Sequence, residues 1–285
     1  MSKLQANISG IIKSSVIDGP GNRMVIFFQE CNLNCMYCHN SHTIGLCNLC
    51  GTCVDTCPTN SLKIDSENKR IIHNENTCTR CDECIKVCPE NSSPFYKQMS
   101  VEDVICEILE VKNFISGITV SGGEVMLHAS FLNLLFQEIK SNSELKHLSI
   151  LIDSNGNINQ EKWDSLLPYI DGVMLDIKAY SLDIHMQITG YSNEKILNSI
   201  AYLNRKNKLL ELRFVLVPNY NNDEIEIRNI ANLMKSVSPS VGKTLIKMRN
   251  HGIRKEFAYL KEPNEDEMIH AKSILTQSDL DILVI

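Results

Sequence analysis

The chain has 285 residues, a formal net charge of -6 and 43% hydrophobic residues. This composition suits a globular protein with a sizeable core and excludes a disordered chain. The mildly acidic balance gives no electrostatic footprint for nucleic acid, and no stretch approaches the roughly 18 uncharged apolar residues of a membrane helix. We therefore expect neither nucleic acid nor a membrane among its partners.

The cysteines are unevenly distributed along the chain. Of the 12 cysteines, all but Cys106 lie between Cys31 and Cys88. Residues 1–21 lack the apolar run of a secretory signal, so we expect a location in the reducing cytoplasm, where dense cysteine clusters bind metal. Cys106 lies in an expected helix without a cysteine partner in register, and we interpret it as an ordinary helix residue.

An apolar run at Met24–Gln29 predicts the first strand, and a compact cysteine motif follows it. The motif reads Cys31-x3-Cys35-x2-Cys38-His39. Its second half matches the C-x2-C-H of haem c attachment, but covalent haem attachment normally needs an exported chain and leaves Cys31 unexplained. Three cysteines can instead hold three irons of a [4Fe-4S] cube, which leaves the fourth iron open for chemistry.

Residues 47–88 contain one cysteine spacing twice. Each copy reads C-x2-C-x2-C-x3-C-P, the run of bacterial ferredoxins, in which the fourth cysteine binds the other cluster. The alternative is a pair of zinc knuckles, which needs no proline after the last cysteine. We predict a ferredoxin-like insert at residues 46–91 with two [4Fe-4S] clusters, one held by Cys47, Cys50, Cys53 and Cys88, and the other by Cys57, Cys78, Cys81 and Cys84.

From about residue 98 onward, helical and strand patterns alternate at the spacing of βα units. A capping-box variant at Ser100 to Asp103 predicts a helix to about Val111. The further expected strands are Ile118–Val120, His147–Asp153, Gly172–Ile177, Leu210–Val217, Thr244–Met248 and Leu280–Ile285. The further expected helices lie at Phe131–Ile139, near Trp163, and at Ile196–Asn204, Ile227–Met234 and Met268–Leu275. The pattern predicts an α/β fold with an open parallel (β/α) barrel, and a flat doubly wound sheet is the alternative.

Polar motifs stand at the ends of three of these strands. Gly122-Gly123-Glu124 follows the expected strand Ile118–Val120. Its glycines would let the backbone approach a ligand, and Glu124 would supply an acceptor. Asp153-Ser154 ends the next strand, and Met174 to Lys178 ends the one after it. A turn, a cap or a solvated side chain is the ordinary interpretation of each motif alone. Parallel barrels, however, keep their sites at this edge.

Together, the C-x3-C-x2-C loop and the Gly-Gly-Glu motif resemble the radical S-adenosylmethionine (SAM) superfamily. A narrower resemblance, to glycyl-radical-enzyme activating proteins, covers almost the whole chain. It rests on Ile17 to Arg23, Tyr37 to Asn40, Asp176 to Lys178, His185, Thr189-Gly190 and Arg213 to Pro218. The ferredoxin-like insert is found in many members, and the chain is most similar to the YjjW-type activases.

The resemblance implies a partial open (β/α)6-type radical SAM barrel, formed by residues 1–45 and 92–285 around the insert. It implies that Cys31, Cys35 and Cys38 hold the SAM-binding [4Fe-4S] cluster on which catalysis depends. The residues that it places around SAM are Tyr37, His39, Gly122, Gly123, Glu124, Asp176, Lys178 and Arg213. It also implies a monovalent cation near SAM, bound by Asp153, Ser154, Met174 and Asp176.

Two residues have open alternatives. Activases usually carry a Leu-Pro-Tyr-His-like segment in a late strand, where this chain has Ile246 to Gly252. We expect His251 to take the role of that histidine toward SAM, and the alternative is a histidine in a solvent-exposed loop. For Arg213, a buried structural role is as good an interpretation as a SAM contact.

The implied activity is the activation of a partner enzyme. With an electron from a flavodoxin or ferredoxin, SAM would be cleaved to methionine and a 5'-deoxyadenosyl radical, which would remove a hydrogen from one backbone glycine of a glycyl-radical enzyme. Three [4Fe-4S] clusters are expected in all. Two alternatives are a radical SAM enzyme acting on a small molecule or peptide, and a ferredoxin-like electron-transfer protein, which leaves the C-x3-C-x2-C motif unexplained.

Overall fold

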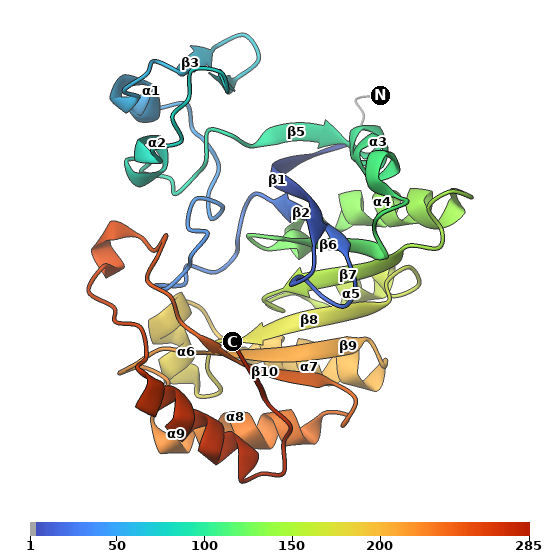
Figure 1. The fold of residues 1–285 in the computed structure, drawn as a ribbon, viewed down its shortest axis with the longest axis vertical. Coiled ribbons are helices and arrows are strands. Elements are labelled where there is room, and N and C mark those ends of the chain that lie inside the picture. Colours follow the sequence, from blue (N-terminus) through green and yellow to red (C-terminus); the bar gives the residue numbers. More distant parts are fainter. Residues whose placement is uncertain (1–3) are drawn as a thin grey trace.

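One large, mostly parallel sheet dominates the fold (Figure 1). The computed structural model describes residues 4–285, and in this part of the chain a nine-stranded sheet has the order β11-β10-β9-β8-β7-β6-β2-β1-β5. Neighbouring strands from β2 to β11 are parallel, whereas β1 is antiparallel to β2 and β5. The strands of this sheet are β1 (Gln5–Ser15), β2 (Arg23–Phe28), β5 (Lys97–Ser100), β6 (Gly117–Gly122), β7 (Ser149–Ser154), β8 (Gly172–Ile177), β9 (Leu209–Leu216), β10 (Gly242–Lys247) and β11 (Leu283–Val284).

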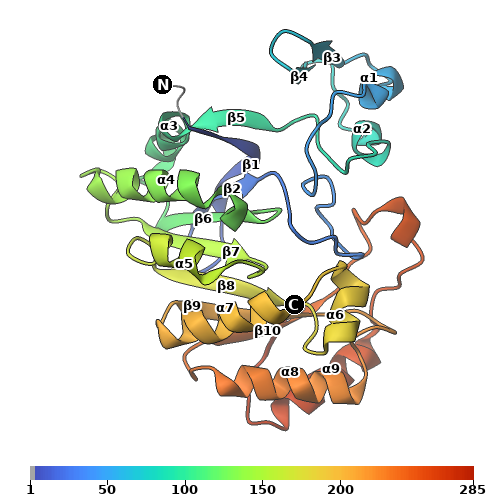
Figure 2. The ribbon, with the colours of Figure 1, turned by 180° about the vertical axis from the view of Figure 1, so that it is seen from behind.

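Helices connect the parallel strands, and Figure 2 shows α4, α5 and α7 in front of the strands. The connecting helices are α3 (Val101–Val111), α4 (Ala129–Ser141), α5 (Gln160–Leu166), α6 (Leu182–Thr189), α7 (Glu194–Arg205), α8 (Glu224–Ser236) and α9 (Glu265–Thr276), with 3-10 turns η1 (Val125–His128) and η2 (Lys255–Phe257). The parallel strands follow chain order without a reversal. A doubly wound sheet reverses its order at a switch point, so the structure differs from that alternative. No helix within residues 4–285 is long and apolar enough to cross a membrane.

Most of the expected βα elements are confirmed. Strand β8 has the expected bounds, and α3 begins with the expected capping box, in which the Ser100 side chain accepts from the Asp103 amide. The expected C-terminal strand is shorter, because only Leu283–Val284 pairs with β10. Strands β1 and β5 and helix α6 are not predicted by the sequence pattern.

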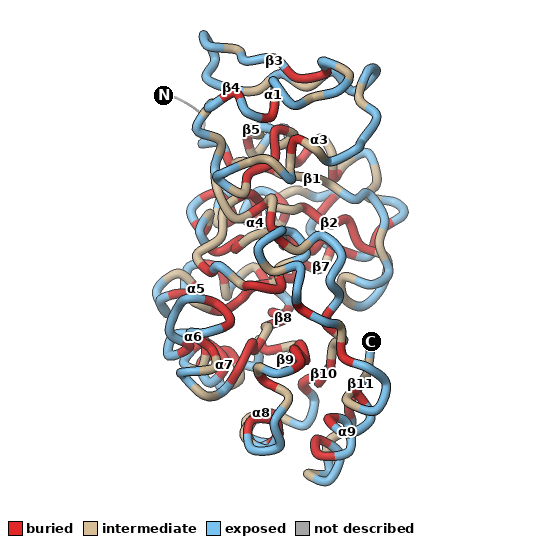
Figure 3. Tube along the Cα trace, turned by 90° about the vertical axis from the view of Figure 1, so that its left-hand side faces the viewer, coloured by how far each residue is buried: buried red, intermediate tan, exposed pale blue. Residues whose placement is uncertain are grey.

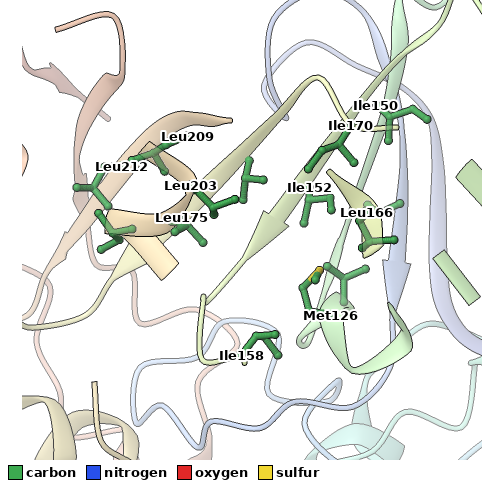
Figure 4. Close-up of a cluster of buried hydrophobic side chains, with 14 of the residues drawn as sticks. Met126, Ile150, Ile152, Ile158, Leu166, Ile170, Leu175, Leu203, Leu209 and Leu212 are labelled. Carbon is green, nitrogen blue, oxygen red and sulfur yellow. The ribbon is translucent and has the colours of Figure 1, made fainter. Parts of the chain in front are cut away.

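The main core lies between the sheet and its helices. The tube in Figure 3 is mostly buried along the central strands and mostly exposed in the segment around β3 and β4. Ile152 of β7 and Leu175 of β8 are fully buried with Leu166 and Leu203 of the covering helices α5 and α7 (Figure 4). Trp163 of α5 is also fully buried in this core. The parallel strands are therefore held by apolar packing, which leaves their carboxyl ends free to carry polar groups.

Arg23 is the last residue of the Ile17 to Arg23 motif and the first residue of β2. Its buried guanidinium donates to the Thr119 hydroxyl at 2.7 Å and to the carbonyls of Pro20, Ile118 and Ser149 at 3.1, 2.5 and 3.1 Å. Burial lowers the pKa of Arg23 to about 10. This arginine ties β2, β6 and β7 together at the end of the sheet opposite their carboxyl edge.

The segment that contains the repeated cysteines forms a small separate unit at one end of the molecule (Figure 1). It consists of α1 (Thr52–Thr56), β3 (Leu62–Asp65), β4 (Arg70–His73) and α2 (Glu83–Lys86). Strands β3 and β4 pair only with each other, and the unit has its own small apolar cluster around Leu62. Its two ends meet at a bridge between Thr43 and Ser92.

Candidate functional site

The loop after β2 carries Cys31, Cys35 and Cys38 and follows the carboxyl end of that strand. Its first residues are fixed to a later part of the loop, because the Cys31 amide donates to the Ile44 carbonyl at 2.9 Å. Burial raises the pKa of Cys31 to about 12 and that of Cys35 to about 11. These thiols are neutral in the metal-free chain, and a coordinated metal would remove their protons.

The last turn of α6 holds the middle of this cysteine loop. The amides of Asn34 and Met36 donate to the carbonyls of Thr189 and Ile188 at 3.0 and 2.9 Å. Helix α6 has no counterpart among the expected elements, although Thr189-Gly190 at its end belongs to the motifs that carry the family resemblance. The position of the cysteine loop thus depends on a helix that follows it by about 150 residues in the chain.

Glu226 of α8 holds the other end of α6. Its buried carboxylate accepts hydrogen bonds from the amides of Tyr180 and Ser181 and from the Ser181 hydroxyl. Amides at this end of a helix have no partner within the helix. Helix α8 therefore fixes α6, which in turn fixes the cysteine loop.

Arg254 is the residue of the late loop that contacts the cysteine loop. Its buried guanidinium donates to the Asn34 side chain at 2.6 Å and to the carbonyls of Asn34 and Cys35 at 3.1 Å each. His251 lies in the same late loop and is exposed. The Arg249 amide lies 3.2 Å from Nε2 of His39, so this loop also borders the end of the cysteine motif. The sequence gives no signal for Arg254, because an arginine in a loop carries no sign of its target.

Gly122 and Gly123 allow close packing against the end of β2. At Gly122 the φ angle is 124°, and an added Cβ would lie 2.2 Å from the Phe28 carbonyl oxygen. An added Cβ at Gly123 would lie 2.1 Å from the Glu30 carbonyl oxygen. Without side chains at these two positions, the end of β6 lies directly against the end of β2.

Glu124 joins the ends of β6 and β7. One oxygen of its fully buried carboxylate accepts from the Met126 amide at 2.9 Å and from the Ser154 hydroxyl at 2.8 Å. The other oxygen accepts from the Asn155 amide at 2.7 Å. Burial raises the pKa of Glu124 to about 7 despite these donors. The expected acceptor is thus engaged within the fold itself.

Asp153, Asp176, Lys178 and Arg213 form one charged network at the carboxyl ends of β7 and β8. Arg213 of β9 donates to Asp176 at 2.6 Å and also to Asp153, and Lys178 donates to Asp176 at 2.7 Å. Burial alone would raise the pKa of Asp176, but the charges of Arg213 and Lys178 outweigh burial and hold this pKa below its usual range. Two cations balance two carboxylates, so the network is polar and has no net charge.

The expected cation-binding residues already have other contacts. Asp153 and Asp176 share Arg213, the Ser154 hydroxyl donates to Glu124, and Met174 is buried. The structure therefore brings these side chains to one strand edge, with a guanidinium between the two carboxylates.

Tyr37 borders the charged network from the cysteine loop. The Lys178 ammonium lies 5.7 Å from the centre of its ring. The Tyr37 hydroxyl is buried and has no hydrogen-bonding partner within residues 4–285. His185 of α6 is also fully buried, and burial, followed by the charge of Lys178, lowers its pKa to about 4. Since buried polar atoms normally have partners, the Tyr37 hydroxyl fits a site that takes a polar ligand.

The backbone of the insert repeats with the cysteine spacing. Apart from Lys69, the left-handed residues of the insert occur in three pairs, each 31 residues apart in the chain, namely Leu49 and Arg80, Gly51 and Asp82, and Asn60 and Asn91. The thiol contacts repeat as well. Amides of Leu49 and Arg80 point to the sulfurs of Cys47 and Cys78 at 3.4 Å each, and amides of Ser61 and Ser92 point to those of Cys57 and Cys88 at 3.3 and 3.4 Å. Two equivalent half-units thus present their cysteines in the same way.

The cysteines of the insert gather in two groups that cross between the halves. One small cavity is lined by Cys57 from the first half and by Cys78, Cys81 and Cys84 from the second. In the other group, burial raises the pKa of Cys53, and so do the charges of Cys47, Cys88 and Cys50. In each group the fourth cysteine comes from the opposite half.

The donor set, made of cysteine thiols, fits iron-sulfur cubes. Within residues 4–285, no three His, Cys, Asp or Glu side chains are arranged to bind one metal ion together. A cube spaces its thiolates around four irons, so its cysteines lie farther apart than those around one tetrahedral zinc. Amides directed at thiolate sulfur, such as that of Leu33 at 3.4 Å from the Cys31 sulfur, are typical neighbours of such cubes. All of the described cysteines are free, and Cys106 lies exposed on α3.

Known proteins resemble this chain in sequence and in fold. The chain is 30% identical over 245 residues to the (2S)-3-sulfopropanediol dehydratase activating enzyme of Klebsiella oxytoca, covering 80% of this chain and 76% of that protein. It is 26% identical over 275 residues to the pyruvate formate-lyase 1-activating enzyme of Escherichia coli, covering 92% and 91%. The crystal structure of QueE from Escherichia coli superposes with a TM-score of 0.53 at 13% identity, covering 99% and 94%, which supports the fold alone.

The match to a known superfamily covers the greater part of the chain. The sequence pattern of the radical SAM superfamily matches residues 25–229, which include the cysteine loop, the Gly-Gly-Glu motif and the charged network. The two relatives named above are both activating enzymes. The chain belongs to the radical SAM superfamily and, within it, to the family of activating enzymes.

Proposed function

We propose that this protein activates a glycyl-radical enzyme by removing a hydrogen from one of its backbone glycines. The observation that carries the proposal is the position of the three-cysteine loop beside a buried charged network, in a chain whose relatives are activating enzymes. Cys31, Cys35 and Cys38 would hold a [4Fe-4S] cluster with one open iron. When bound, this cluster supplies the electron that cleaves SAM to methionine and a 5'-deoxyadenosyl radical.

The residues of the chain would bind and orient SAM. The charged network of Asp153, Asp176, Lys178 and Arg213 offers both charges to the ammonium and carboxylate of the methionine end, and it is already ordered before a ligand arrives. Preorganised dipoles and charges of this kind lower the cost of binding a polar ligand.

Further SAM contacts are expected around this network. The Tyr37 hydroxyl is a buried group without a partner in the described chain, and it would gain one from a ligand. His39 lies at the end of the cysteine motif, and His251 lies in the late loop that borders this motif. Both stay expected SAM contacts. Gly122, Gly123 and Glu124 would act by setting the shape of the strand end. A monovalent cation bound by Asp153, Ser154, Met174 and Asp176 would have to share the two carboxylates with Arg213.

Residues 46–91 would form a ferredoxin-like insert within a partial (β/α)6-type barrel made of residues 1–45 and 92–285. The 31-residue repeat of backbone conformation and the crossed cysteine groups support two further [4Fe-4S] clusters with the expected ligands. A flavodoxin or ferredoxin would be the electron donor. The YjjW-type subgroup and a cytoplasmic location stay predictions from the sequence.

The full chain, reconstituted without oxygen, tests the proposal. We expect about twelve irons, three cubes of four, and formation of 5'-deoxyadenosine from SAM with dithionite. Adding the glycyl-radical enzyme encoded nearest to this gene should produce a glycyl radical signal in electron paramagnetic resonance (EPR). Cys35→Ala should lose the 5'-deoxyadenosine and about four irons, while the matched control Cys106→Ala should lose neither.

Two results would contradict these assignments. An iron content of one cube would exclude the clusters of the insert. Formation of 5'-deoxyadenosine by the Cys35→Ala protein would exclude the proposed SAM site. Turnover of a small molecule with no radical on the partner would favour a radical SAM enzyme of another type.

A further inference from the structure

We infer that Asn155 is a positioning residue that donates a hydrogen bond to the Cys31 sulfur and thereby raises the reduction potential of the cluster that Cys31 would hold. The inference rests on the proposed cluster at Cys31, Cys35 and Cys38. It concerns the first loop residue after β7, which has no role among the residues expected to bind SAM or a cluster.

The Asn155 side chain lies between the cysteine loop and the loop after β7. Its amide nitrogen donates to the Asn32 side-chain oxygen at 2.9 Å and lies 3.8 Å from the Cys31 sulfur, within the longer range of hydrogen bonds to sulfur. Its side-chain oxygen accepts from the Asn157 amide at 2.8 Å. Because the oxygen faces a donor and the nitrogen faces an acceptor, the orientation of this amide group is determined by its neighbours.

Asn155 is also held rigidly through its backbone. The Asn155 amide donates to the buried carboxylate of Glu124 at 2.7 Å, and the Ser154 hydroxyl donates to the same carboxylate. From the other side, the Asn32 side chain donates to the Asn157 carbonyl at 2.7 Å. Asn155 is 8% exposed, so water does not compete freely for its side-chain donor. Hydrogen bonds through Asn155 thus link Glu124 of the Gly-Gly-Glu motif to the cysteine loop.

The direction of the effect follows from charge. Reduction adds one negative charge to a cluster and its thiolates, and hydrogen bonds to sulfur are one of the factors that set cluster potentials. An N–H donor stabilises the more negative, reduced state. Loss of the Asn155 donor should therefore make the cluster harder to reduce, even when all three cysteine ligands remain.

The test measures the potential of the cluster in the reconstituted full chain. Redox titration followed by EPR gives the midpoint of each cluster, and the component that changes on addition of SAM identifies the cluster of the cysteine loop. In Asn155→Leu, which is similar in size and has no donor, we expect about a tenfold lower ratio of reduced to oxidised cluster at the wild-type midpoint. For a one-electron couple this corresponds to a midpoint about 59 mV more negative. The components insensitive to SAM should not move.

Asn32→Ala is the matched control, because it removes the two side-chain hydrogen bonds of Asn32 and leaves the Asn155 donor in place. A much smaller shift in Asn32→Ala supports a direct hydrogen bond, and an equal shift would overturn the inference in favour of loop positioning. An unchanged midpoint in Asn155→Leu with full iron content would also overturn it. If the leucine variant loses the cluster, Asn155→Ser decides, since its short hydroxyl cannot span the same distance. Absence of any SAM-sensitive component in the wild type would instead refute the proposed cluster.

Discussion

Replacing Glu124 by glutamine tests how a buried carboxylate supports the site. Glutamine keeps one oxygen for the Met126 amide and the Ser154 hydroxyl, but its NH₂ group would face the Asn155 amide, donor against donor. Glu124 keeps an acceptor at both oxygens even as the neutral acid. An unsatisfied buried donor costs about 1–3 kcal/mol. We therefore expect the Glu124→Gln protein to be less stable than the wild type at pH 5.5.

The size of this difference should depend on pH. The pKa of Glu124 is about 7 in the folded chain, raised by burial above its ordinary value of 4.5. The folded state therefore holds this proton more tightly, and wild-type stability falls as pH rises from about 4.5 to about 7. At about 1.36 kcal/mol per pKa unit, roughly 2 kcal/mol of this loss lies between pH 5.5 and 8. Glutamine does not titrate, so the stability of Glu124→Gln lacks this pH dependence. The difference in stability between wild type and variant should therefore be roughly 2 kcal/mol smaller at pH 8 than at pH 5.5.

Thermal unfolding measured by fluorescence checks this expectation, because Trp163 is the single tryptophan and is fully buried. For a chain of this size, 2 kcal/mol corresponds to about 4 °C in Tm. The gap in Tm between wild type and Glu124→Gln should be about 4 °C smaller at pH 8 than at pH 5.5. Glu161→Gln, at an exposed glutamate of α5, is the control and should show a constant gap. A constant gap for Glu124→Gln as well would refute the reasoning.

Three further changes probe the supports of the site. Gly123→Ala would place a Cβ 2.1 Å from a backbone oxygen and should lower Tm by several degrees. The control Gly10→Ala, whose Cβ would have no atom within 4 Å, should change Tm little. Equal changes in Tm would contradict this expectation. Glu226→Ala should speed hydrogen exchange of the Tyr180 and Ser181 amides directly before α6, because their acceptor is lost, and unchanged exchange would show that these amides are held by other contacts. Cys53→Ala should reduce dithionite-driven SAM cleavage only in part and flavodoxin-driven activation of the partner much more steeply, and equal losses in a folded variant would favour a structural insert.

The parallel strands could be predicted from the sequence because each is a short apolar run followed by polar residues. Gly172–Ile177 is such a run, and its bounds are those of β8. Helix α6 could not be predicted in this way. Its apolar residues Leu182, Ile184, Met186 and Ile188 alternate as in a strand. The residue directly before it, Ser181, is held by Glu226 from a distant helix. Tertiary contacts therefore decide its conformation.

The candidate site was predictable to the extent that its groups occur in motifs. The order of strands brings Asp153 and Asp176 to one edge of the sheet, as their positions at the ends of parallel strands predict. The partners of these groups were not predictable. Nothing in the sequence pairs Arg254 with Cys35 or Asn155 with Cys31, because such contacts join loops that are far apart in the chain.

The narrow base of the insert bears on how such a unit can be gained or lost. The chain enters and leaves it side by side, at the bridge between Thr43 and Ser92 and at the 3.1 Å bond from the Gly45 amide to the Asn91 carbonyl. An inserted segment whose ends meet imposes little strain on its host, and its length adds only a slowly growing entropy of loop closure. Evolution could therefore lengthen, shorten or remove this segment at one point of the chain, while the radical-forming edge of the sheet keeps its own supports from α6 and Arg254.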